Sequence, residues 1–306
     1  MKLSAVLVLF AAVLPAQDPP RPRITGVAHI ALFVHDVDAA RQFYKGLLGY
    51  EEPFSLKNPD GSLSLTFVKV NDRQYIELFP EREAGSDRLN HISIETDDAE
   101  GMRRYLASKG IKVPDSVPHG RIGNANFNVT DPDGHTVEIV QYLPDGWSMR
   151  DKGKAMGSRR ISPRMMHVGI IVNSLEPSMR FYRDVLGFEE IWRGSSNGKV
   201  LSWVNMKVPD GEDYIEFMLH DPLPAADKRG SAHHICLVVD DMDRAAAELR
   251  ERAANAHYSR PMEIRTGTNR KRQMNLFDPD GTRTELMEPR TVDGKPAVSS
   301  TAPAPK

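Results

Sequence analysis

The sequence is poor in three features, and each scarcity narrows what the protein can do. Its 306 residues include one cysteine, which excludes an intramolecular disulfide and any metal site built from several thiolates. Its formal net charge is only −2, so no electrostatic reason exists to expect a nucleic-acid partner. One apolar run stands out, at the N-terminus, and it is shorter than the roughly 20 residues that span a bilayer. With 40% hydrophobic and 27% charged residues, the chain is expected to be a soluble globular protein of about two domains, with neither nucleic acid nor membrane as a partner.

Residues 1–16 have the pattern of a secretory signal peptide: Lys2, then an apolar run to Leu14, then Ala16 at the expected cleavage point. The pattern predicts export, to the periplasm or out of the cell. Residues 17–23 are expected to form an extended, proline-rich leader, and residues 291–306 a disordered tail.

An internal repeat dominates the rest of the chain. NFNVTDPDGHTVEIVQ (residues 126–141) is matched by QMNLFDPDGTRTELME (residues 273–288), and each predicts a strand, a tight turn at Asp-Pro-Asp-Gly and a returning strand. HIALFVHDVDAARQFYKGLLGY (residues 29–50) aligns without a gap with HVGIIVNSLEPSMRFYRDVLGF (residues 167–188). The repeat predicts two similar domains joined by a linker rich in glycine and charge, at residues 24–144, 164–290 and 145–163 respectively.

Apolar periodicity predicts two β-α-β-β-β units in each half, an α+β fold. In the first unit a strand over 27–34 precedes a helix that Asp36 caps and Gly49 ends, and three strands follow, at about 50–57, 63–70 and 74–79. The second unit has a strand over 90–96 and a helix over 98–109, followed by strands near 111–113, 124–130 and 135–142. The second half repeats this order.

Each half places two histidines and two glutamates at matching strand positions: His29, Glu77, His91 and Glu138, and then His167, Glu216, His234 and Glu285. Alternate strand residues face one side, so all four side chains of a half can converge while their neighbours pack. A lone strand histidine is usually a packing residue, but eight matching positions in two otherwise divergent halves favour ligation. Two imidazoles and two carboxylates would suit Ni²⁺, Fe²⁺, Mn²⁺, Co²⁺ or Zn²⁺ and leave coordination positions free.

These motifs resemble the vicinal oxygen chelate superfamily, which includes glyoxalase I, methylmalonyl-CoA epimerase, fosfomycin-resistance enzymes and extradiol dioxygenases. The resemblance rests on the strand histidine followed by FY and LLG or VLG, on YIE, on NHI or HHI, and on DPDG with a glutamate after three further residues. It implies two tandem domains, each of paired β-α-β-β-β units that form an open, cupped barrel around a divalent metal.

By position, the resemblance places metal ligands on the same eight residues and makes Glu138 and Glu285 the candidate proton-transfer bases. It implies a small-molecule substrate with adjacent oxygens and isomerase or lyase chemistry, in a monomer or a homodimer. Glutathione is not expected as the substrate, because the arginine and asparagine that bind it in glyoxalase I are replaced here by Phe33 and Glu81 in the first half and by Ile171 and His220 in the second.

Two other functions remain open at this stage. The spacing of His167, His234 and Glu285 fits the iron site of extradiol ring-cleaving dioxygenases, but Asn275 stands where those enzymes carry a signature tyrosine. A fourth protein ligand in each half also leaves less room for O₂, which favours proton transfer. The third possibility is a non-catalytic binding protein similar to bleomycin-resistance proteins, which lack metal ligands. The sequence leaves open whether the ligands pair within each half or between halves.

Overall fold

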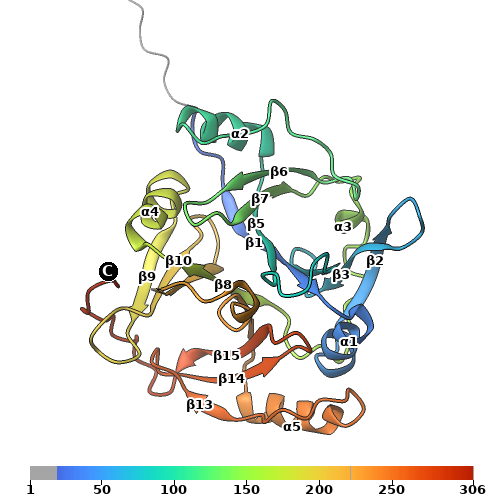
Figure 1. The fold of residues 1–306 in the computed structure, drawn as a ribbon, viewed down its shortest axis with the longest axis vertical. Helices are drawn as coiled ribbons and strands as arrows, with labels where there is room; N and C mark the ends of the chain where they lie inside the picture. The colour runs from blue at the N-terminus through green and yellow to red at the C-terminus, as the bar shows by residue number, and fades with distance from the viewer. Residues whose placement is uncertain (1–18, 221, 306) are drawn as a thin grey trace, which may run out of the picture.

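The computed structural model of the protein describes residues 19–220 and 222–305 (Figure 1). The predicted signal peptide, residues 1–16, lies outside the described residues. Within the described part, no helix has both the length and the apolar character needed to cross a membrane.

The first half folds into one seven-stranded sheet in the order β2-β3-β4-β1-β5-β7-β6. Its strands are β1 (Ile24–Val34), β2 (Glu51–Lys57), β3 (Leu63–Lys69), β4 (Tyr75–Pro80), β5 (Leu89–Thr96), β6 (Ala125–Thr130) and β7 (Thr136–Gln141). Its helices are α1 (Val37–Arg41), which continues as the π-helix η1 (Gln42–Leu47), and α2 (Ala99–Ser108). β1 pairs in parallel with β4 and antiparallel with β5, so both predicted units of this half share one sheet.

The second half repeats this plan in an eight-stranded sheet of order β13-β14-β15-β12-β8-β11-β10-β9. Its strands are β8 (Met165–Val172), β9 (Glu189–Gly194), β10 (Trp203–Lys207), β11 (Tyr214–Leu219), β12 (His234–Val238), β13 (Ile264–Thr266), β14 (Lys271–Phe277) and β15 (Arg283–Thr291). Its helices are α4 (Leu175–Met179) with the π-helix η2 (Arg180–Val185), the short 3₁₀-helix η3 (Ala226–Lys228), and α5 (Met242–Ala253). The predicted α+β fold with two tandem domains is confirmed.

Aspartates cap α1, α2 and α5, and for α1 the sequence predicts the cap at Asp36. The Asp36 carboxylate accepts hydrogen bonds from the backbone N–H groups of Asp38 and Ala39, and Asp98 accepts one from Gly101. Each caps a first turn whose N–H groups have no partner within the helix. The helices after β1 and β8 then widen into π-helices, a feature that apolar spacing alone does not distinguish from an α-helix.

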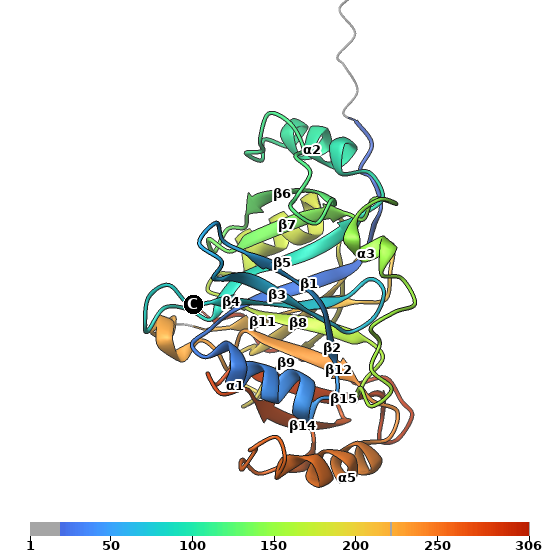
Figure 2. The same cartoon turned by 90° about the vertical axis from the view of Figure 1, so that its right-hand side faces the viewer.

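The two sheets lie between α2 at one end of the molecule and α5 at the other (Figure 2). One hydrophobic core includes side chains from both halves. The Asp-Pro-Asp-Gly turns join the halves further: the Tyr44 hydroxyl donates to Asp278 over 3.1 Å, and the Tyr182 hydroxyl donates to Asp131 over 3.0 Å. Each turn therefore fastens its own half to the π-helix of the other half.

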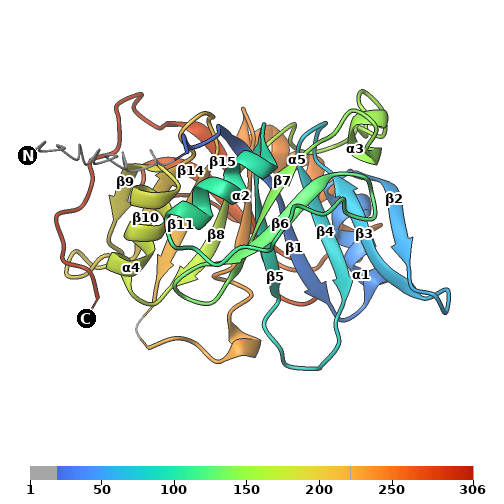
Figure 3. The ribbon, with the colours of Figure 1, turned by 90° about the horizontal axis from the view of Figure 1, so that it is seen from above.

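Three segments differ from the sequence-based expectation. Residues 111–113 form no strand: Ile111 and Val113 pack against the core while Pro114, which has no N–H, follows them. The linker contains a helical turn, α3 (Trp147–Arg150). The tail predicted to be disordered runs beside β9 (Figure 3), where Ser300 N donates to Arg193 O over 2.9 Å. Backbone pairing along an exposed sheet edge orders this segment in spite of its prolines.

Candidate metal centres and their cavities

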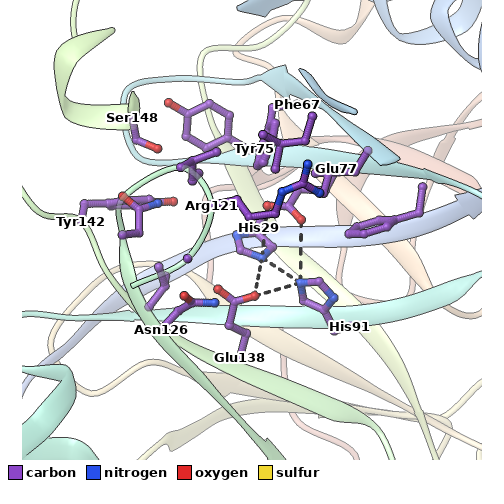
Figure 4. A pocket seen from close by; sticks show the side chains of 17 residues that line it. His29, Phe67, Tyr75, Glu77, His91, Arg121, Asn126, Glu138, Tyr142 and Ser148 are labelled. Atoms are coloured by element: carbon purple, nitrogen blue, oxygen red, sulfur yellow. Dashed lines mark hydrogen bonds and ion pairs between the residues drawn. The ribbon is translucent and has the colours of Figure 1, made fainter. Parts of the chain in front are cut away.

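In the first half, four adjacent strands each supply one predicted ligand. His29 lies on β1, Glu77 on β4, His91 on β5 and Glu138 on β7, and their side chains point toward one another (Figure 4). His29 Nε2 is 3.0 Å from His91 Nε2, 3.6 Å from Glu77 Oε1 and 3.5 Å from Glu138 Oε2. The His91 Nε2 to Glu138 Oε2 distance is 3.1 Å.

The second half repeats this cluster on β8, β11, β12 and β15. His167 Nε2 is 3.0 Å from His234 Nε2 and 3.6 Å from Glu285 Oε2, and His234 Nε2 is 3.4 Å from Glu216 Oε2. Both clusters therefore draw their four side chains from a single half, so the exchange of ligands between halves that the sequence allowed does not occur.

The donor geometry fits a divalent ion. Two nitrogen donors at about 2.1 Å from one ion, and at right angles to each other, lie about 3.0 Å apart. The Nε2–Nε2 separation is 3.0 Å in both clusters. All eight residues are at most 9% exposed. Two buried carboxylates that approach the same pair of imidazoles need a cation between them, and a metal ion supplies it.

The surroundings shift the pKa values of the two carboxylates of the first centre in opposite directions. Burial raises the pKa of Glu77. Burial also opposes ionisation of Glu138, but the His29 and His91 imidazoles outweigh it and hold the pKa of Glu138 well below its usual range. Burial lowers the pKa of His29, and Glu77 and Glu138 more than reverse that effect. Glu138 is thus the carboxylate of this pair that stays ionised most readily.

The ligands of the second centre are more deeply buried, and the Arg283 guanidinium lies beside them. Burial lowers the pKa values of His167 and His234 well below their usual range. Burial, with Glu216 nearby, raises the pKa of Glu285 to about 7, while Arg283 acts in the opposite direction. In the first half, Thr136 takes the place of Arg283, two residues before the second glutamate of the cluster. The two centres therefore have the same types of ligand but differ in the charge of the residues around them.

The second histidine of each cluster, His91 or His234, is oriented by a hydrogen-bond acceptor at the ring nitrogen that faces away from the centre. Asn90 Oδ1 lies 3.0 Å from His91 Nδ1, and the backbone oxygen of Ala232 lies 2.7 Å from His234 Nδ1. A proton on Nδ1 that is donated to these oxygens leaves the Nε2 lone pair directed at the centre. The analysis of ligand spacing missed Asn90, although its position directly before the histidine in the NHI motif is the signal that could have identified it.

An open cavity of about 670 Å³ reaches all four donors of the first centre. Most of its wall is apolar or aromatic, from Leu56, Leu65, Phe67, Tyr75, Phe79, Val140 and Tyr142 (Figure 4). Arg121 lies at the mouth, where it is exposed and donates to Ser64 Oγ over 3.0 Å and to the Lys57 backbone oxygen. The linker contributes Ser148, so this segment helps to build the site.

The second cavity, about 760 Å³, reaches Glu216 and Glu285 but neither histidine. Its wall is mostly polar or indole, with Trp192, Trp203, Arg265, Thr266, Thr268, Asn269, Gln273 and Arg283. None of the four residues at the positions that bind glutathione in glyoxalase I lines either cavity: Phe33, Glu81, Ile171 and His220. Glu81 instead pairs with His35 and Arg88.

The model of the Glyoxalase/Bleomycin resistance protein/Dioxygenase superfamily matches residues 26–139 and 164–286. The chain belongs to this superfamily. Lactoylglutathione lyase of Schizosaccharomyces pombe is 23% identical over 308 residues, covering 85% of this chain and 95% of that protein.

Two solved structures of this superfamily's fold illustrate the architecture. The Mn(II)-bound glyoxalase from Novosphingobium aromaticivorans is similar with a TM-score of 0.65 at 17% identity, over 93% of this chain and 89% of that one. The 2,3-dioxygenase LapB from Pseudomonas sp. KL28 is similar with a TM-score of 0.67 at 15% identity, over 93% and 99%. At these identities the likeness establishes the fold, and membership of the superfamily agrees with the divalent metal predicted from the sequence.

Proposed function

We propose that the protein is a metal-dependent isomerase or lyase that transfers a proton next to a chelated carbonyl group. The observation that carries the proposal is the first cavity, in which two glutamates on the outer strands β4 and β7 flank two histidines on the inner strands β1 and β5. In this reading all eight clustered histidines and glutamates are metal ligands, four to each centre.

A divalent ion held by the first cluster would act as a Lewis acid toward two adjacent substrate oxygens and acidify the neighbouring C–H bond. The chain itself supplies the base. Glu138, kept ionised by its two imidazole neighbours, is the candidate acceptor of the proton in the first half, and Glu285 is its counterpart in the second. Glu77 approaches from the other flank, where its raised pKa suits it to return a proton.

The wall of the first cavity supports a small, oxygenated substrate with an apolar or aromatic group. Phe67, Tyr75 and Tyr142 place aromatic rings along one side of the cavity (Figure 4), and we expect these rings to limit the access of water to the cluster. Exclusion of water strengthens each electrostatic interaction in the site and protects a carbanion-like intermediate from random protonation. The N-terminal pattern of a signal peptide supports the further proposal that the protein is exported and acts outside the cytoplasm.

Proton NMR in D₂O with Mn²⁺- or Zn²⁺-loaded protein and a panel of α-hydroxycarbonyl compounds tests the proposal. We expect metal-dependent exchange of the proton next to the carbonyl, with a loss of about 100-fold or more in Glu138→Gln. Glu285→Gln removes the candidate base of the second centre in the same way. Loss of exchange in either variant supports the proposal and shows which centre acts, whereas exchange retained in both would overturn it.

An oxygen electrode with Fe²⁺-loaded protein and a catechol panel separates the alternatives. The aromatic wall of the first cavity is the observation that favours ring cleavage, since it would also accommodate a catechol. Rapid oxygen uptake without proton exchange would replace the proposal by dioxygenase activity. Ligand binding with neither reaction would replace it by the non-catalytic binding function.

A further inference from the structure

The two halves differ in the charge of the residue beside the second histidine of the cluster, His91 in the first half and His234 in the second. In the second sheet, Arg283 on β15 is the register partner of His234 on β12. In the first sheet, β5 and β7 pair in the same parallel fashion, with Ile92 beside Val137, so Thr136 holds the corresponding place. A neutral residue in one centre is therefore replaced by a guanidinium in the other.

The Arg283 guanidinium lacks an anionic partner. Its Nη2 lies 2.8 Å from His234 Nδ1 and 3.9 Å from Met218 Sδ, and its Nε is buried without a hydrogen-bond partner among the described residues. The nearby carboxylates of Glu216 and Glu285 face the histidines instead. In the described part of the chain, Arg283 makes no ion pair.

The contact with His234 cannot satisfy this arginine in the metal-binding state. If Nε2 of His234 is to offer its lone pair to an ion, Nδ1 must carry the proton, which it donates to the Ala232 oxygen over 2.7 Å. Nδ1 is then no longer an acceptor for Arg283. Within the protein the guanidinium then has only a thioether as an acceptor and its buried Nε has none, so an anion in the cavity that Arg283 lines would be a favourable partner.

The charges of the second cavity point to an anion. Two carboxylates (−2) and a divalent ion (+2) cancel, and Arg283 and Arg265, which line the same cavity, leave a charge of +2. The polar side chains of Asn269 and Gln273 lie in the same wall. In the first cavity the four ligands and an ion also cancel, and Arg121 is exposed at the mouth with a backbone and a hydroxyl acceptor already in place.

We propose that the second centre binds an oxyacid, a carboxylate with a hydroxyl or oxo oxygen on the adjacent carbon, whose carboxylate group pairs with Arg283. A guanidinium is suited to this role because its parallel N–H donors match the two oxygens of a carboxylate. The first centre, with Thr136 in place of the arginine, takes uncharged carbonyl compounds. This inference concerns binding at the second centre and does not depend on which reaction the first centre catalyses.

Isothermal titration calorimetry of Mn²⁺-loaded protein with glycolate tests the proposal, with hydroxyacetone as an uncharged ligand that has the same pair of adjacent oxygens. Arg283→Thr introduces the residue that the first half has at this position, Thr136. Arg283→Lys keeps the positive charge without the two parallel N–H donors of a guanidinium. We expect glycolate to bind about 10- to 100-fold more weakly to Arg283→Thr and to an intermediate degree to Arg283→Lys, the range expected for a hydrogen bond to a charged group. Hydroxyacetone binding should not change.

Arg121→Thr is the matched control, since it removes the cavity arginine of the other centre and should leave glycolate binding unchanged. Elemental analysis of each variant should show no loss of Mn²⁺ in Arg283→Thr, because removing a positive charge does not weaken cation binding. Equal glycolate affinity in wild type and Arg283→Thr would overturn the proposal. So would a loss of Mn²⁺ in Arg283→Thr, which would make the arginine a support for His234, or glycolate binding that is unaffected when the metal is stripped.

Discussion

The second histidines of the two clusters, His91 and His234, rely on hydrogen-bond acceptors of different kinds. His91 depends on a side chain, Asn90, and His234 depends on the backbone oxygen of Ala232. Either acceptor fixes the tautomer and the plane of the imidazole ring, but only the first can be removed by substitution. The first centre is therefore the one whose metal affinity can be tuned without touching a ligand.

Replacing Asn90 by alanine should weaken metal binding at the first centre by about 10- to 100-fold, the usual effect of losing the group that orients a ligating histidine. Competition titration of Mn²⁺ with a chelator would resolve the affinities of the two centres. Only the affinity of the first centre should fall. Asn90→Asp, which keeps an acceptor oxygen next to His91 Nδ1, is the control and should retain near-normal affinity. Unchanged affinity in Asn90→Ala would mean that packing alone orients His91.

Among single residues, the sequence identifies ligands better than it identifies their neighbours. Eight donors stand out because two halves repeat the same residue types at nearly the same spacings, and the structure gathers them as two groups of four. Arg283 has no comparable signal. Its place beside His234 depends on the register between strands that are 49 residues apart in the chain, and a strand arginine is ordinarily solvated.

At the scale of elements, the two Asp-Pro-Asp-Gly turns show how similar motifs acquire different properties. Asp131 has an imidazole partner, His135 Nδ1, at 2.9 Å. Thr282 replaces that histidine in the second turn, and burial raises the pKa of Asp278 to about 7. The motif predicts the turn in both halves, but its contact with a tyrosine of the opposite half depends on tertiary packing.

Asp278→Asn should stabilise the protein at pH 8. The folded state keeps the Asp278 proton up to a pKa of about 7, whereas the unfolded chain loses it near the usual value of 3.8. Protonation therefore stabilises the folded state fully below about pH 4, and this contribution is lost as the pH rises toward 7. At pH 8 the asparagine should gain about 1–3 kcal/mol over the buried carboxylate, and at pH 4 the two proteins should differ little. Thermal unfolding at both pH values measures this, and Asp131→Asn, which breaks the pair with His135, should show no gain at pH 8.

Gly49 links the end of η1 to the linker. Its φ is +80°, and a Cβ added there would lie 2.2 Å from the backbone oxygen of Arg159. Gly61 has a similar φ of +86° with nothing within 4 Å, which makes it a matched control. Gly61→Ala should cost about 1 kcal/mol for the left-handed backbone, and Gly49→Ala about 3 kcal/mol or more because the linker must also move. Urea unfolding compares them, and equal losses would show that the linker yields freely.

Element types were more predictable than element ends and irregular segments. Alternation and turn residues located the long strands, and the Asp36 cap located the start of α1. Two features were not accessible from local pattern. Apolar spacing is compatible with either helix type at Gln42–Leu47, and residues 111–113 contact the core without joining a ladder. In both cases packing against distant elements decides the backbone.

At the scale of the whole molecule, sheet pairing decides where the ligands meet. The sequence repeat is compatible with ligands from one half or from both, because either arrangement uses the same residues at the same spacing. The parallel pairing of β4 with β1, the antiparallel pairing of β1 with β5 and the parallel pairing of β5 with β7 keep the four donors of the first half on adjacent strands. The halves nevertheless share one hydrophobic core, so they are joined in folding while their centres are built separately.

The separate construction of the centres predicts that they load metal independently. Wild-type protein should bind two divalent ions per chain, and the double substitution of His29 and His91 by alanine should reduce this to one. The remaining ion should keep its wild-type affinity, because all four donors around His167 and His234 come from the second half and sites with no shared ligand behave additively. The reciprocal substitution of His167 and His234 is the matched control and should spare the first centre. Elemental analysis and calorimetric titration of both double variants give the stoichiometries. If either double variant lost both ions while remaining folded by circular dichroism, the two clusters would have to share ligands, and the within-half arrangement would be wrong.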